Sequence, residues 1–153
     1  MIELAANPLI YPFKPPSSRH WVEIAPGVRW IRLSMPFRLD HINVWAIDTH
    51  DGWVLVDTGL SLRETEKRMA AMGLAMEKVK AIFISHEHSD HITGLPAISK
   101  KYQLPVFITA ATYANCNLPV EEHLLADFDA GKPIAIDGLS VTPFRKHHDA
   151  ADP

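Results

Sequence analysis

The sequence predicts an α+β domain, and three observations indicate this fold class. Residues 21–56 have β-type apolar runs and contain an Asp51-Gly52 pair, which is typical of antiparallel hairpins. Residues 61–72 are good helix formers. Residues 81–108 follow the pattern of a strand, a loop, a helix and a second strand, which indicates that the domain combines helices with a sheet.

The first part of the predicted domain is a meander of three or four antiparallel strands that begins near Trp21. Its apolar runs are residues 28–33, 42–47 and 53–56. The prolines within residues 1–20 are incompatible with a helix or a central strand there. We therefore predict an extended, proline-rich arm at residues 1–20 and a single αβ domain at residues 21–153.

The second part begins with a capping-box pattern. Ser61 is followed three residues later by Glu64, which predicts a helix that runs through Met72 and ends at Gly73. The following predicted elements are a strand at 81–85, a helix at 95–102, a strand at 105–108 and a hairpin formed by 134–136 and 139–144 around Asp137-Gly138. Residues 113–128 are ambiguous.

Composition and charge limit the classes of function. The chain is 47% hydrophobic and 22% charged, as in ordinary globular proteins. Its net charge of −3 and scattered Lys and Arg do not favour nucleic acid as a partner, although nucleic acid remains a candidate substrate. The single cysteine, Cys116, excludes an internal disulfide, and neither a signal sequence nor a spanning apolar run is present. We expect a cytoplasmic protein that does not enter a membrane.

The strongest functional pattern is a group of metal-binding side chains in residues 85–91, Ser-His-Glu-His-Ser-Asp-His. Residues two apart in an extended segment point the same way, so His86 and His88 can bind one ion, with Asp90 and His91 facing a neighbouring position. Imidazole and carboxylate together suit zinc, and also manganese or iron. Glu87 lies between two of these residues and should point away from the ion, in a surface or structural role.

The pattern His-x-His-x-Asp-His behind an apolar strand resembles the metallo-β-lactamase superfamily. Two more segments agree, Val-Leu-Val-Asp-Thr-Gly at residues 54–59 and His148-Asp149-Ala150 near the end. The resemblance implies that Asp57 supports the metal loop from below. It also implies that His148 is a further ligand, with Asp149 as its hydrogen-bonding neighbour. His147 is the alternative to His148, because adjacent strand residues face opposite sides.

The resemblance covers about residues 28–153 and implies half of an αββα sandwich, a mixed β-sheet with helices on one face. We expect one full metal site and at most two ions per chain, because the motifs that complete a second site are absent. Half a sandwich exposes an apolar sheet face, which predicts a homodimer. Residues 28–60 resemble general hydrolases and residues 61–153 resemble cytoplasmic nucleases and phosphodiesterases. A chain fused near Leu60 and truncated after Pro153 is therefore a further hypothesis.

The function implied by the resemblance is that of a zinc-dependent hydrolase. The metal makes a bound water acidic and delivers hydroxide to an ester, a thioester or a phosphodiester, while Asp90 orients that water. The substrate would be a small molecule or a phosphodiester. The alternative is a truncated or chimeric scaffold that binds metal with little or no catalysis.

Overall fold

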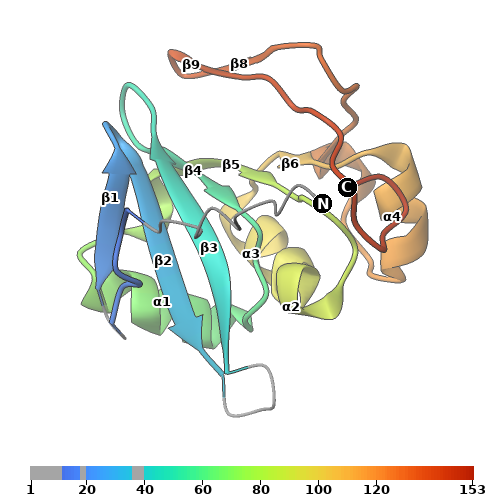
Figure 1. Ribbon diagram of the computed structural model, residues 1–153. Helices are drawn as coiled ribbons and strands as arrows, with labels where there is room; N and C mark the ends of the chain where they lie inside the picture. Colours follow the sequence, from blue (N-terminus) through green and yellow to red (C-terminus); the bar gives the residue numbers. More distant parts are fainter. Residues whose placement is uncertain (1–11, 18–19, 36–39) are drawn as a thin grey trace, which may run out of the picture.

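The computed structural model describes residues 12–17, 20–35 and 40–153 (Figure 1). The predicted arm at residues 1–20 lies partly outside them, since residues 1–11 and 18–19 are not described. Residues 12–17 form neither helix nor strand. In the part of the chain that is described, no helix is both long and apolar enough to cross a membrane.

The main sheet has seven strands in chain order. They are β1 (Trp21–Ala25), β2 (Val28–Ser34), β3 (His41–Asp48), β4 (Trp53–Val56), β5 (Val79–Phe83), β6 (Val106–Phe107) and β7 (Leu125–Ala126). The first four pair antiparallel, which confirms the predicted meander, and β4 to β7 pair parallel. The sheet is therefore mixed, as predicted.

The parallel strands require crossover connections, and helices supply them. The helices are α1 (Leu62–Ala71), α2 (Ser89–Ile92), α3 (Leu95–Tyr102) and α4 (Ala110–Cys116), with single 3₁₀ turns η1 (Met76–Lys78) and η2 (Glu122–Leu124). Figure 1 shows α1 and α3 together on one face of the sheet. The α+β prediction is confirmed, and the ambiguous residues 113–128 contain the end of α4, η2 and β7.

The capping-box prediction is wrong in its detail. Ser61 occupies the N-cap position of α1, but its side chain makes no capping hydrogen bond. The Glu64 carboxylate instead accepts a hydrogen bond from Arg68 Nε at 2.7 Å, so it does not reach back to the start of the helix. The predicted end is correct, because Gly73 adopts a φ of +73° that favours glycine after a helix.

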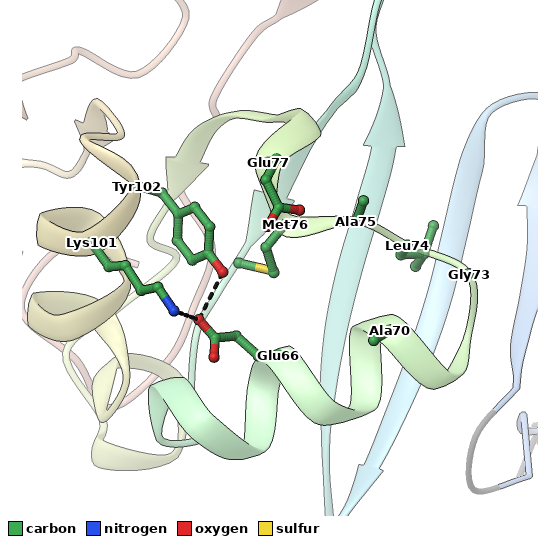
Figure 2. A pocket seen from close by; sticks show the side chains of 9 residues that line it. All are labelled: Glu66, Ala70, Gly73, Leu74, Ala75, Met76, Glu77, Lys101 and Tyr102. Atoms are coloured by element: carbon green, nitrogen blue, oxygen red, sulfur yellow. Dashed lines mark hydrogen bonds and ion pairs between the residues drawn. The ribbon is translucent and has the colours of Figure 1, made fainter.

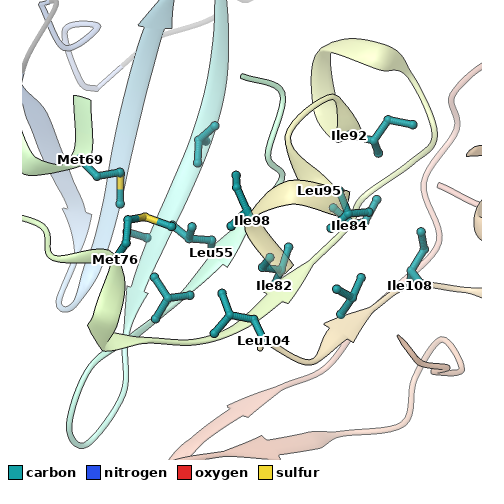
Figure 3. Packing of buried hydrophobic residues seen from close by; sticks show 14 of the residues in the cluster. Leu55, Met69, Met76, Ile82, Ile84, Ile92, Leu95, Ile98, Leu104 and Ile108 are labelled. Atoms are coloured by element: carbon teal, nitrogen blue, oxygen red, sulfur yellow. The ribbon is translucent and has the colours of Figure 1, made fainter. Parts of the chain in front are cut away.

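Apolar side chains alternate between the two faces of the central strands, and each face has its own core. On the helical face, Leu55 and Ile82 pack with Leu95 and Ile98 of α3, all at most 1% exposed (Figure 3). Burying each such side chain stabilises the fold by about 1.5–3 kcal/mol. This packing fixes β4 and β5 side by side, and the candidate site lies where they end.

On the opposite face, Val54, Ala81 and Phe83 form a smaller cluster under a separate hairpin. The hairpin consists of β8 (Ile134–Ile136) and β9 (Leu139–Val141) around Asp137-Gly138, as predicted, but its second strand ends at Val141 and not at the predicted residue 144. Its turn is fixed to the β3–β4 turn, since Asp137 Oδ2 accepts hydrogen bonds from Thr49 Oγ1 at 2.8 Å and Asp51 N at 2.9 Å. The chain leaving β9 then returns to the sheet edge that carries the histidines.

Candidate metal centre

Three histidines meet beside the carboxyl end of β5. His86 and His88 follow β5 directly, and His148 comes from the segment after β9. His86 Nε2 lies 3.1 Å from His88 Nδ1 and 3.1 Å from His148 Nε2. One nitrogen from each ring lies within 4.8 Å of the other two. The sheet thus joins two local residues with one that is distant in sequence.

This donor set fits a transition-metal ion. Zinc binds imidazole nitrogen at about 2.0–2.1 Å, so tetrahedral ligands lie about 3.3 Å apart, close to the observed spacing. His86 is 6% exposed, and its burial, followed by the charges of His91 and His88, lowers its pKa to about 4. The ring is therefore neutral near pH 7, and the neutral ring is the form that binds a metal.

Ser85 sets the orientation of the buried ring. Its hydroxyl lies 2.9 Å from His86 Nδ1 and 2.9 Å from Asp57 Oδ2. If the hydroxyl donates to the carboxylate, His86 Nδ1–H donates to the hydroxyl, and His86 Nε2 keeps its lone pair toward the other two histidines. The sequence analysis did not identify Ser85, although its position just before the first histidine could have suggested this role.

Asp57 lies beneath the metal loop. It is 4% exposed, and Oδ1 accepts a hydrogen bond from Ser85 N at 2.9 Å. Its Oδ2 lies 2.8 Å from His91 Nδ1. Asp57 also has a φ of +67°, in the left-handed region that Asp and Asn enter more readily than most residues. The carboxylate thus connects the end of β4 to the loop.

Asp90 and His91, on α2, lie beside the three histidines without joining their group. His91 Nε2 is 3.3 Å from Asp90 Oδ2, and the His91 ring centroid is 4.1 Å from that of His86. Burial works against protonation of His91, but the Asp57 hydrogen bond and the charges of both aspartates outweigh it and raise its pKa. The ligand roles predicted for Asp90 and His91 therefore remain predictions.

The C-terminal segment contributes more than His148. The carboxylate of Asp149 lies 2.9 Å from His148 Nδ1, and its backbone oxygen lies 3.1 Å from His88 Nε2. Both contacts involve the ring nitrogens that face away from the cluster. The alternative residue, His147, is exposed and is not part of the group.

Two cavities deserve comparison with this site. One, of about 520 Å³, lies between α1 and α3, where Glu66 Oε1 accepts hydrogen bonds from Lys101 and Tyr102 at 2.7 Å (Figure 2). None of the predicted site residues lines it. The other, of about 470 Å³, lies on the opposite sheet face, and Trp45 and Phe144 are among its largely apolar lining residues.

Comparisons with known proteins agree with the fold and with the histidine pattern. The profile of the metallo-β-lactamase superfamily matches residues 37–151, a range that includes the hypothetical junction near Leu60. Exodeoxyribonuclease YycJ of Bacillus anthracis is 34% identical over 116 residues, which cover 72% of this chain and 43% of that protein. Exodeoxyribonuclease WalJ of Streptococcus pneumoniae is 28% identical with the same coverage. Ribonuclease J 1 of Streptococcus pyogenes is 25% identical over 72% of this chain and 22% of that protein.

Among solved structures, a beta-lactamase domain protein from Burkholderia ambifaria superposes with a TM-score of 0.74 at 22% identity, covering 93% of this chain and 54% of that one. The chain spans about half, or less, of the length of these relatives. The shared fold and the extent of the profile match place the chain in the metallo-β-lactamase superfamily.

Proposed function

We propose that this chain carries the metal centre of a zinc-dependent phosphodiesterase that acts on nucleic acid. The observation that carries the proposal is the convergence of His86, His88 and His148 at the carboxyl edge of the sheet. The names of several relatives supply the substrate class, since YycJ, WalJ and ribonuclease J are all named as nucleases. The net charge of −3 gives no general affinity for a polyanion, so recognition must be local.

The donor set favours zinc over manganese or iron. Three imidazole ligands suit zinc and would leave a fourth position open, as in catalytic zinc sites. A zinc ion bound there would act as a Lewis acid and lower the pKa of a bound water molecule. Asp90 and His91 offer two further donors beside the three histidines. A second metal site there would therefore have fewer ligands than the first.

The side chains around the three histidines have separate roles in this proposal. Ser85 and Asp57 orient His86 so that Nε2 would face a bound ion, and the low pKa of His86 keeps the ring neutral. Asp90 is 28% exposed at the side chain, and in this proposal its carboxylate would orient the attacking water and accept its proton. The side chain of His148 is 39% exposed, so a phosphodiester would have access to the site from that side.

A partner is also proposed, namely a second copy of the chain. Phe144 is 80% exposed beside the apolar cavity that Trp45 and Val56 help to line. A twofold dimer would cover the part of this sheet face that the β8–β9 hairpin leaves open, with the helices outside. Light scattering tests this directly, since a monomer at micromolar concentration would contradict it.

The enzymatic proposal is tested with purified chain loaded with zinc. We expect turnover of bis(p-nitrophenyl) phosphate and cleavage of end-labelled single-stranded DNA or RNA, both dependent on metal. His88→Ala should abolish both activities, and His147→Ala is the matched control that should retain them. A chain that binds zinc but hydrolyses no phosphodiester faster than free zinc would refute the enzymatic proposal and support a metal-binding scaffold.

A further inference from the structure

The segment that carries His148 has little structure of its own. Residues 142–153 contain no helix or strand, and His148 is exposed. Two contacts close the segment on itself, Arg145 Nε to Asp152 Oδ1 at 2.7 Å and Lys146 N to Pro153 O at 2.9 Å. A ligand on such a segment needs an external anchor, because an unanchored segment would lose conformational entropy each time it bound the ion.

Glu87 supplies an anchor. Its Oε1 accepts a hydrogen bond from Ala151 N at 2.8 Å, three residues beyond His148. Apart from the His148 ring itself, the other polar contacts of the segment with the metal loop and α4 use neutral carbonyl oxygens. The Asp149 carbonyl lies 3.1 Å from His88 Nε2, and the Asp152 carbonyl lies 3.4 Å from Thr112 Oγ1. A hydrogen bond to an ionised acceptor is about twice as strong as one between neutral groups.

The second carboxylate oxygen shows that this placement is costly. Glu87 Oε2 is buried, and none of the described residues donates a hydrogen bond to it. A buried polar atom without a partner destabilises a fold by about 1–3 kcal/mol, and more when charged. Burial, and next the charge of Glu87, raises the pKa of the buried Cys116 thiol, so the carboxylate also lies close to α4.

We propose that Glu87 is a positioning residue that fixes His148 in the metal centre by holding Ala151. His86 and His88 converge with His148, and Glu87, between them in an extended stretch, points away to Ala151. Three consecutive residues thus provide two ligands and the anchor of the third. The inference rests on the proposed metal centre, and it concerns metal affinity and geometry independently of hydrolysis.

The test is cobalt(II) binding to the whole chain, measured by calorimetry and by the visible absorption of the bound ion. Loss of a residue that orients a ligand typically weakens metal binding by about 10–100-fold, and we expect this for Glu87→Ala, with an altered spectrum. Glu87→Gln keeps an oxygen acceptor for Ala151 N. Its cobalt affinity should therefore lie within a few-fold of the wild type, and its spectrum should match that of the wild type. Glu122→Ala, which removes an exposed glutamate, is the control.

A double-mutant cycle separates positioning from general stability. If Glu87 acts through His148, Glu87→Ala should weaken cobalt binding no further once His148→Ala is present. If Glu87→Ala does not fold, Glu87→Asp replaces it, because the shorter side chain keeps the charge but cannot reach Ala151 N. Additive losses, or wild-type affinity and spectrum in the Glu87 variants, would overturn this inference alone. Failure of the wild type to bind cobalt would overturn the metal centre as well.

Discussion

Replacing Asp57 by Asn should loosen the metal loop even when no metal is bound. Asn has nearly the same size and tolerates the φ of +67° that this position requires, so the backbone need not change. What is lost is the negative charge, which now serves Ser85 N at 2.9 Å and His91 Nδ1 at 2.8 Å. Asp57→Asn therefore isolates the electrostatic role of this carboxylate.

The magnitude follows from burial and partner count. Asp57 is 4% exposed, so water cannot replace what the substitution removes. A hydrogen bond to a charged group contributes about 1.5–3 kcal/mol, and Asn retains one acceptor oxygen for Ser85, so we expect a loss of about 2–3 kcal/mol. Asp57→Ala should lose a further 1–2 kcal/mol, approximately, because alanine also tolerates the left-handed conformation poorly.

The loss should depend on pH in a defined direction. Asp57 raises the pKa of His91 above its ordinary value of 6.5. The stabilisation from this pair is fully present below pH 6.5 and disappears as the pH rises through the raised pKa. The penalty of Asp57→Asn should therefore be larger near pH 6 than at a pH above the raised pKa of His91, where the ring is neutral in both proteins.

Urea unfolding in the presence of a chelator measures this penalty, with fluorescence from the four tryptophans as the probe. Asp51→Asn, on the exposed β3–β4 turn, is a suitable control for loss of one negative charge. A penalty below about 0.5 kcal/mol at both pH values would refute the reasoning, since surface substitutions already reach that size.

Three further predictions concern the site and its surroundings. His148→Ala should weaken zinc binding by at least about tenfold whereas His147→Ala should not, and equal affinities in a competition titration would contradict the assignment of His148. Gly59→Ala should destabilise the chain by about 2–3 kcal/mol in urea unfolding, because its new Cβ would lie 1.6 Å from the Asp90 carbonyl oxygen. An unchanged stability would contradict this, because it would mean that the segments carrying Gly59 and Asp90 can move apart at little cost. Burial raises the pKa of Tyr102 to about 12, so stability should fall as the pH rises from 10 toward 12, and ultraviolet titration showing an ordinary pKa of 10.0 would contradict this.

Local patterns predicted much of the fold. The Asp51-Gly52 pair located the β3–β4 turn, and apolar spacing located α3 at the observed residues Leu95–Tyr102. By contrast, β7 has only two residues and exists because β6 lies beside it, which a local pattern does not reveal. Ser61 occupies the N-cap without a side-chain capping bond, and Glu64 binds Arg68, a contact between side chains that the capping-box pattern does not show.

The candidate site was predictable to the extent that its residues are close in sequence. His86 and His88 share one short segment, so their convergence follows from strand geometry. His148 is 62 residues away from His86, and only the resemblance to a known superfamily pointed to it. The anchoring contact between Glu87 and Ala151 spans 64 residues and depends on how the C-terminal segment returns to the sheet. No periodicity in the sequence encodes that return.

The central claim is that His86, His88 and His148 together hold a transition-metal ion. Elemental analysis of chain that has been loaded with zinc and then desalted tests it most directly, with the triple alanine variant of these histidines treated in the same way. We predict about one tightly held zinc per wild-type chain, as expected for a three-histidine site, and essentially none in the variant. Equal zinc content in the two proteins, or none in the wild type, would contradict the account.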